Sequence, residues 1–371
     1  MIPKQLNFIV ITIGLLLLFL AVGFGGASAQ IEFPPPPEPG IANETCLACH
    51  GQPDQQVELP SGEILYVTID SDGFNHSVHG TEGYACVQCH TTHSEYPHEP
   101  INAQTLREYK LDQYLMCDRC HADKYTALID GVHAHALANG NQEAAICSDC
   151  HGSHEIGPPN DPRSRIPQTC EQCHSQISDK YEHSVHGSAL IGEGNPNVPS
   201  CTDCHGSHNI QGPTGSDFKL NSPQICAECH ADPKLMDQYG ISTNVFDTYL
   251  ADFHGTTSTL FEPEFEGQQP NTPVCIDCHG VHDIKSSSDP DSSVMKENLL
   301  VTCQKCHPDA STNFPAAWLG HYEPDRDRYP LVYFVDLFYK IFIPFVLGVM
   351  VLFIGTDIFR RIINKRRERA Q

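Results

Sequence analysis

The sequence is poor in positive charge. Between Gln30 and Pro330 it has 14 Lys and Arg residues against 43 Asp and Glu, a net charge of −29 in a chain whose overall formal charge is −24. A surface this acidic repels phosphate backbones, which excludes nucleic acid as a partner. It favours cationic partners, or simple solubility beside like-charged neighbours, and it should make docking rates depend on salt.

The chain also has little of the alternating apolar and polar pattern that is typical of half-buried strands. Only the segment from Val57 to Asp70 has this pattern, around a Pro-Ser-Gly turn, and it predicts a small hairpin. Segments such as 121–137 and 174–190 predict helices of a few turns. The expected fold class is therefore mainly α with much irregular structure.

No cysteine lies outside a single motif. All eighteen cysteines belong to nine CxxCH segments. Two cysteines followed at once by histidine suit thioether bonds to the vinyl groups of a haem, with the histidine as an iron ligand. Zinc needs only the CxxC pairs, and a disulfide framework explains neither the spacing nor the histidine. The predicted attachment cysteines for nine haem c groups are Cys46, Cys49, Cys86, Cys89, Cys117, Cys120, Cys147, Cys150, Cys170, Cys173, Cys201, Cys204, Cys226, Cys229, Cys275, Cys278, Cys303 and Cys306.

The 22 histidines provide two ligands for each haem. The proximal ligands predicted by the motifs are His50, His90, His121, His151, His174, His205, His230, His279 and His307. Four further histidines follow a motif by three residues, and five occupy one position in aligned segments such as NHSVHG and EHSVHG. These nine predicted distal ligands are His93, His154, His208 and His282, then His79, His133, His186, His254 and His321.

Four histidines remain, namely His76, His98, His135 and His183, and we interpret them as surface histidines or as neighbours of a ligand. His76 and His183 lie three residues before predicted ligands, so a swap of roles within either HSVH segment is the alternative. His154 follows His151 by only three residues, which keeps both on one side of a macrocycle. His154 should therefore serve a neighbouring haem.

The motifs form a repeat of about four and a half units. Complete units run over 46–93, 117–154, 170–208 and 226–282, and a half unit runs over 303–321. The 301 residues from Gln30 to Pro330 leave about 33 residues for each of nine haems, too few for a conventional hydrophobic core. We expect an elongated ectodomain over 46–322 whose core is the haems and whose folding depends on haem insertion.

The two ends of the chain indicate export and a membrane anchor. Residues 1–29 have the pattern of a signal peptide cleaved before Gln30, with an uncleaved anchor as the alternative, and 30–45 form a proline-rich linker. Residues 331–359 predict a transmembrane helix, and the basic tail 360–371 predicts a cytoplasmic end. Haem c is attached after export, so the ectodomain is expected in the periplasm or outside the cell.

The predicted transmembrane helix has no histidine, and a single helix offers no enclosed quinone pocket. It therefore cannot hold a haem b by itself. We expect a membrane partner, a cytochrome b or another quinone-reactive subunit, to pack against the helix.

Residues 42–322 resemble bacterial multihaem cytochromes c of the doubled CxxCH type, with distal ligands in HG segments and CxxCHGxH motifs. The resemblance implies electron relay between the quinone pool and extracytoplasmic redox partners, beside a cytochrome b. The chain departs from tetrahaem quinol dehydrogenases, whose anchor is N-terminal. It also lacks the CxxCK site of ammonia-forming nitrite reductases.

The expected function is electron transfer, without catalysis by this subunit. The alternative is a multihaem reductase or oxidase of a small nitrogen or sulfur compound, in which one haem keeps an open position and a nearby histidine supplies protons. A third hypothesis is a haem-bearing scaffold in an extracellular filament. The match between nine motifs and nine distal histidines favours the first hypothesis.

Overall fold

The computed structural model describes residues 40–158, 160–212, 216–261, 272–317, 321, 326–327 and 330–368. The predicted signal peptide at 1–29 lies outside the described residues, as do most of the linker at 30–45 and the last three residues of the basic tail.

Helices make up most of the described chain, and they are short except near the C-terminus. The first half contains α2 (Asn43–His50), α3 (Ser71–His76), α4 (Val78–Thr81), α5 (Cys86–Cys89), α6 (Leu106–Gln113), η1 (Tyr114–Arg119), α7 (Ala122–Ile129), α8 (Val132–Ala138) and α9 (Cys147–His151). The second half contains α10 (Arg165–Glu182), α11 (Val185–Gly187), η2 (Ser188–Gly192), α12 (Cys201–His205), α13 (Ser216–His230), α14 (Pro233–Met236), η3 (Asp237–Tyr239), α15 (Val245–Ala251), α16 (Phe253–Thr259), α17 (Cys275–His279), α18 (Leu299–Gln304), α19 (Phe314–Ala317) and α20 (Pro330–Glu368). The mainly α fold class is confirmed.

The predicted hairpin is present. Strands β1 (Gln56–Glu58) and β2 (Ile64–Tyr66) pair antiparallel, with Val57 opposite Leu65. The turn between them contains Gly62 at φ +87°, a left-handed conformation that glycine adopts without strain. This is the one sheet within the described residues.

The continuous helices predicted over 121–137 and 174–190 are wrong, because each is broken just before its distal histidine. Between α10 and α11, Ser184 is extended, and its hydroxyl accepts a hydrogen bond from the Gly187 N–H at 3.0 Å. This is an N-cap, which starts a new helix in a new direction. Between α7 and α8 the extended residue is Gly131, which breaks the helix without a side-chain cap. Each distal histidine therefore lies in the first turn of its own short helix.

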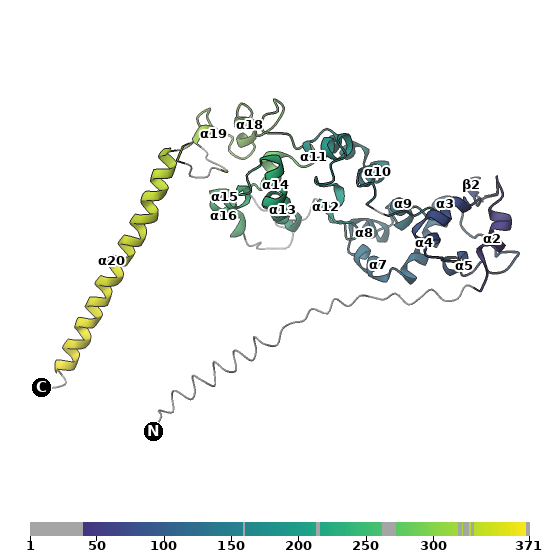
Figure 1. Cartoon of the computed structure of the whole chain (residues 1–371), viewed down its shortest axis with the longest axis horizontal. Helices are drawn as coiled ribbons and strands as arrows, with labels where there is room; N and C mark the ends of the chain where they lie inside the picture. Colours follow the sequence, from purple (N-terminus) through teal and green to yellow (C-terminus); the bar gives the residue numbers. More distant parts are fainter. Residues whose placement is uncertain are drawn as a thin grey trace, which may run out of the picture.

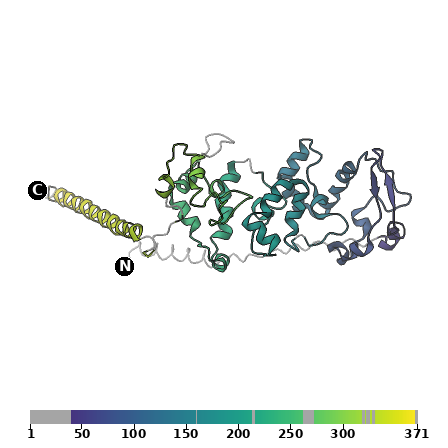
Figure 2. The same ribbon diagram turned by 90° about the horizontal axis from the view of Figure 1, so that it is seen from above.

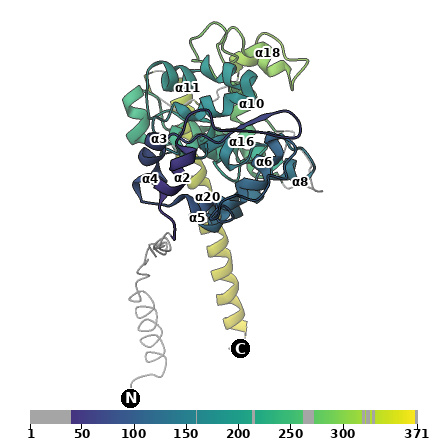
Figure 3. The same ribbon diagram turned by 90° about the vertical axis from the view of Figure 1, so that its right-hand side faces the viewer.

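The elements follow one another along a single axis. Figure 1 shows a progression from α2 and β2 at one end, through α7 to α12, to α18 and α19 at the other end. Figure 2 shows the same order from above, without folding back of the later repeats onto the earlier ones. Viewed along the axis in Figure 3, the short helices form a single bundle of segments from which α20 projects.

Few apolar side chains are buried in the described residues, and they are scattered along the array. They are Leu59, Ala85, Ala103, Ala144, Ile146, Tyr181, Leu190, Met236, Tyr249 and Val274. Several of them precede a CxxCH motif directly. The polypeptide thus forms small apolar contacts at the motifs rather than one continuous core.

Helix α20 is long and apolar enough to cross a membrane. Residues Pro330–Arg367 reach a mean hydropathy of 2.4 over the most apolar window, and none of that window is buried against the rest of the chain. Near the start of the helix, Asp336 pairs with Lys340 one turn later, with Oδ2 and Nζ 2.7 Å apart. A second pair joins Asp357 to Arg361 near the basic end, with Oδ2 and Nε 2.7 Å apart. The helix fits a membrane anchor.

Candidate haem sites

The second CxxCH motif of each complete repeat begins a short helix with the same cap. The side chain before the second cysteine accepts a hydrogen bond from the backbone N–H of the residue before the first cysteine. These bonds run from Ala85 to Gln88 (2.6 Å), from Ile146 to Asp149 (3.0 Å), from Ser200 to Asp203 (2.7 Å) and from Val274 to Asp277 (2.7 Å). Because positions three apart share a helix face, the cap directs both cysteine side chains to one side.

The three capping aspartates each meet a cation from the segment before their motif. Asp149 pairs with Arg107 at 2.8 Å, Asp203 with Arg163 at 2.5 Å, and Asp277 with Lys219 at 3.2 Å. Burial opposes ionisation of Asp149, but the hydrogen bonds from Arg107 and from the Ile146 N–H, with the charges of Arg107 and Lys110, together outweigh it and hold the pKa of that carboxyl below its usual value. The pKa of Asp203 is lowered as well, through its hydrogen bonds from Ser200 and Arg163, which together outweigh burial, so Asp149 and Asp203 stay ionised at neutral pH. The three ion pairs fasten each motif to its repeat.

The cysteines of consecutive CxxCH motifs lie close to one another in space. Within each complete repeat the first cysteines of the two motifs lie close enough to shift each other's pKa, in the pairs Cys46 and Cys86, Cys117 and Cys147, Cys170 and Cys201, and Cys226 and Cys275. Between repeats, the pairs within electrostatic range are Cys89 and Cys117, Cys150 and Cys170, Cys204 and Cys226, and Cys278 and Cys303. The nine motifs thus form one unbroken series, and all eighteen thiols are free.

Every CxxCH histidine faces the ring of one other histidine. The pairs, with the distance between ring centres, are His50 and His98 (6.0 Å), His90 and His154 (5.9 Å), His121 and His79 (6.2 Å), His151 and His208 (6.1 Å), His174 and His133 (6.2 Å), His205 and His282 (6.0 Å), His230 and His186 (6.2 Å), His279 and His321 (6.4 Å), and His307 and His254 (6.4 Å).

These separations fit a metal ion held between two imidazoles. A metal–imidazole bond is about 2 Å long, so two rings on opposite sides of one ion lie roughly 6 Å apart, centre to centre. Rings in direct contact would be closer. Within the described residues no cluster of three or more His, Cys, Asp or Glu side chains is arranged to hold a metal ion. The histidines come in opposed pairs beside paired cysteines, the donor set that haem c requires.

Burial favours the neutral, metal-binding form of several of these rings by lowering the pKa of the imidazole. Burial, followed by the nearby His154, lowers the pKa of His90 to about 4. Burial also lowers the pKa of His186 to about 4, with a smaller effect of His230. The His50 Nδ1 lies 2.8 Å from the Val67 carbonyl oxygen, which leaves Nε2 for an iron.

The facing pairs follow a rule that the sequence did not assign. Four of the predicted distal histidines, His79, His133, His186 and His254, lie in aligned segments that we call VHG-type. Each faces the first motif of the next repeat, as His79 faces His121. A distal histidine that follows a motif by three residues faces the second motif of the preceding repeat, as His154 faces His90. Neighbouring repeats therefore exchange ligands in both directions.

Backbone hydrogen bonds keep the two series of distal histidines in register. The Val78 N–H donates to the Ile156 carbonyl oxygen at 2.8 Å, and two later repeats have the same bond at the same distance, from Val132 to Ile210 and from Val185 to Ile284. Each valine directly precedes a VHG-type histidine, and each isoleucine lies two residues after a CxxCHxxH histidine. One bond thus positions both exchanged ligands.

Steric contact explains why a glycine follows the predicted distal histidine in most VHG-type segments. A Cβ atom at Gly80, Gly187 or Gly255 would overlap the backbone carbonyl oxygen of Phe74, Tyr181 or Tyr249, respectively. The distal turn therefore packs directly against the end of the preceding helix. In the second repeat Ala134 occupies this position, after the different cap at Gly131.

Within both HSVH segments it is the second histidine that faces a CxxCH ring. The side chains of His76 and His183 are 78% and 74% exposed, and each Nδ1 lies against a carbonyl oxygen of its own helix. At the N-terminal end, however, the structure places His98 opposite His50. The predicted distal ligand His93 lies 5.7 Å from His90 in its own motif, with the two rings nearly perpendicular.

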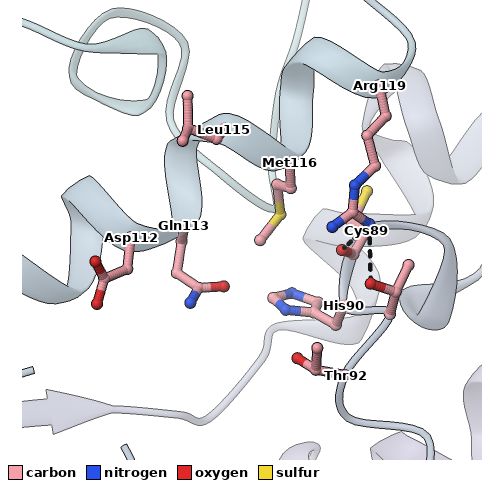
Figure 4. Close-up of a pocket in the computed structure, with 9 residues that line it drawn as sticks. Cys89, His90, Thr92, Asp112, Gln113, Leu115, Met116 and Arg119 are labelled. Atoms are coloured by element: carbon pink, nitrogen blue, oxygen red, sulfur yellow. Dashed lines mark hydrogen bonds between the residues drawn. The ribbon is translucent and has the colours of Figure 1, made fainter. Parts of the chain in front are cut away.

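A cavity of about 390 Å³ opens beside Cys89 and His90. Figure 4 shows Met116 and Arg119 on the opposite wall, both from η1. The Arg119 guanidinium donates to the Thr91 hydroxyl at 3.0 Å and to the Cys89 carbonyl oxygen at 3.5 Å. The space therefore lies between the second motif on one side and η1, which contains the first cysteine of the third motif, on the other.

Comparisons with known families agree with this geometry. Residues 139–231 match the family cytochrome c3, and residues 72–152 match the family cytochrome c7 and related cytochrome c. No curated protein matches the chain. Proteins of these families bind haem c covalently and transfer electrons. Over residues 72–231 the chain is thus similar to the multihaem cytochromes c, and it combines these haem sites with an apolar C-terminal helix that fits a membrane anchor.

Proposed function

We propose that this chain is a nonahaem c-type cytochrome, anchored by α20, which relays electrons between a quinone-linked membrane partner and extracytoplasmic redox partners. The observation that supports this most directly is the unbroken series of nine opposed histidine pairs, each beside its own pair of cysteines. When bound, haem iron exchanges single electrons.

The protein side chains fix each iron and its neighbours. Each site has one histidine from its own motif and one from elsewhere in the chain, and between the complete repeats that second histidine comes from an adjacent repeat, so the position of one site depends on the next. The contacts between Cys89 and Cys117, and between Cys117 and Cys147, keep successive attachment points adjacent. Short, fixed spacing between successive cofactors is what electron passage along a line requires.

The anchor joins the array at its last motif. In Figure 1, α20 leaves from the end that holds α18 and α19, close in sequence to His307 and His321. Its basic end, with Lys365, Arg366 and Arg367, suits the cytoplasmic headgroups, so the haem array lies on the extracytoplasmic side. With no ligand of its own, the helix supports the proposal of a membrane cytochrome b or other quinone-reactive partner.

The proposal is tested with the full chain produced in a host that matures c-type cytochromes. Intact mass should give nine haems, and mild detergent extraction from native membranes should recover a quinone-reactive subunit with the chain. Quinol should then reduce the haems of the purified complex. A chain with fewer than nine haems, or a purified chain that quinol reduces without any partner, would contradict the proposal.

A further inference from the structure

The exchange of ligands between repeats leaves two positions without a regular donor. The first motif of a repeat receives a VHG-type histidine from the repeat before it, so the first motif of the chain, at His50, has no such donor. The second motif receives a histidine from the repeat after it, so the last such motif, at His279, also has none. His321, one of the predicted distal ligands, faces His279 at 6.4 Å, a pairing that the sequence did not assign.

At the N-terminal end the ring that faces His50 is His98. The two ring centres lie 6.0 Å apart with an interplanar angle of 23°, inside the range of the eight other pairs. The His98 Nδ1 lies 2.8 Å from the Glu95 carbonyl oxygen, and the His50 Nδ1 lies 2.8 Å from the Val67 carbonyl oxygen. Both rings are thus oriented through Nδ1 and keep Nε2 for the space between them.

The partner of His98 strengthens the comparison with the internal repeats. Glu95 follows His93 by two residues, as Ile156 follows His154. The Ile156 carbonyl oxygen accepts the N–H of Val78, which comes from the preceding repeat. The Glu95 carbonyl oxygen has no preceding repeat to bind, and the His98 ring bonds to it instead. His98 therefore occupies both the ligand position and the backbone-bonding position of a missing repeat.

His93 is surplus for the same reason. Its equivalents His154, His208 and His282 serve the preceding repeat, and none precedes the first. His90 already faces His154 at 5.9 Å with an interplanar angle of 27°, whereas the His93 ring is tilted by 80° to His90. Apart from this near-perpendicular contact with His90 in its own motif, the His93 ring packs against His98, with the ring centres 5.2 Å apart, and its Nδ1 lies 3.0 Å from the Thr92 hydroxyl.

We propose that His98 is the distal iron ligand of the first haem and that His93 ligates no iron. This rests on the proposed haem at Cys46 and Cys49. Residues 94–100, which lie outside the repeat, would then close the N-terminal end of the series with a ligand from within the same unit.

The test compares full-length His93→Ala with the double variant His93→Ala/His98→Ala, so that His93 cannot replace the ligand that is removed. Carbon monoxide binds reduced haem only where a coordination position is open. The H93A protein should bind none, like a His76→Ala control, and the double variant should bind one equivalent per chain. One equivalent bound by H93A, or none bound by the double variant, would overturn the assignment.

Two further variants locate the open site. His93→Ala/His98→Met should bind no carbon monoxide, because methionine can close the position, and one haem should gain a higher midpoint potential. Adding Cys46→Ala/Cys49→Ala to the double variant should lower the haem count by one and abolish carbon monoxide binding. If the intact mass of the wild-type chain shows no haem at these cysteines, the proposed function fails at this site, independently of the identity of the distal ligand.

Discussion

The backbone N–H of Val185 donates a hydrogen bond to the carbonyl oxygen of Ile284 at 2.8 Å, although the two residues belong to different repeats. Val185 precedes His186, which faces His230, and Ile284 follows His282, which faces His205. A single bond therefore fixes two exchanged ligands. Neighbouring repeats should therefore stabilise one another, both through such hydrogen bonds and through the histidines from two repeats that are proposed to bind the same iron.

Val185→Pro should remove this bond selectively. Val185 is the first residue of α11 and follows the extended Ser184, positions that suit proline and the residue before it. The helix should therefore form, while the carbonyl of the half-buried Ile284 loses its donor at a cost of about 0.5–1.5 kcal/mol. Thermal unfolding of the haem-loaded chain measures the loss. Val185→Ala keeps the N–H and is the matched control, so an equal loss in both variants would refute the role of the bond.

Gly187→Ala should be more damaging than its small size suggests. The added methyl would overlap the Tyr181 carbonyl oxygen, so the turn that holds His186 must move away from α10. We expect a loss of roughly 2–4 kcal/mol, within the range of severe steric substitutions, and a weakened low-spin signal from the site of His230. Gly192→Ala, which has no atom within 4 Å of the added Cβ, is the control. Normal stability of G187A would show that the close packing is not required.

Sequence reasoning predicted the motif-borne features of this molecule and missed those that depend on packing. The hairpin and the long apolar helix α20 follow from local patterns in the sequence. The break before His186 depends on the Ser184 cap, which resembles an ordinary helical serine in the sequence. The position of His98 opposite His50 was inaccessible to alignment, because His98 lies outside the repeat. If the exchange of histidines between repeats had been known, counting the distal histidines available to each motif would have shown that the first motif needs one from outside the repeat.

Asp149→Asn should weaken the attachment of the fourth motif in a pH-dependent way. The pKa of Asp149 is lowered in the folded protein, so its ionised form stabilises the fold above the usual aspartate pKa of about 4. This contribution disappears as the pH falls through the lower folded pKa. Asparagine still accepts from Ile146 but loses the charge opposite Arg107. Thermal unfolding should give a deficit of about 1–2 kcal/mol at pH 7 that shrinks toward pH 3.

The surface variant Asp291→Asn provides the comparison for that experiment. Asp291 is 83% exposed and lies 3.4 Å from Lys285, so its removal should change the stability little at any pH. A deficit for D149N that stays constant from pH 7 to pH 3 would assign its effect to something other than the ionised carboxylate.

Deletion of residues 331–371 should separate the haem array from the membrane without unfolding it. None of the apolar window of α20 is buried against the rest of the chain, so the shortened protein should be soluble and fully loaded with haem. Quinol-dependent reduction in membranes should be lost, whereas chemical reduction by dithionite should be unchanged. Retention of quinol-dependent reduction would mean that the array reaches its donor without the anchor.

All nine irons should be low-spin and six-coordinate. Each CxxCH histidine faces one ring at 5.9–6.4 Å, so with haem bound as proposed both axial positions of every iron would be taken by nitrogen, leaving none for a substrate. Such an iron changes its coordination little between oxidation states and suits electron passage rather than bond making. If one iron were five-coordinate, we would expect it at the site of His279, because the facing His321 lies outside the complete repeats, at a positive φ of 57°. Electron paramagnetic resonance of the oxidised chain measures the spin state of the irons and tests this prediction. A stoichiometric high-spin ferric signal that responds to nitrite, sulfite or hydroxylamine would replace the electron-transfer function with that of a reductase, and loss of that signal on restoring a sixth ligand would locate it.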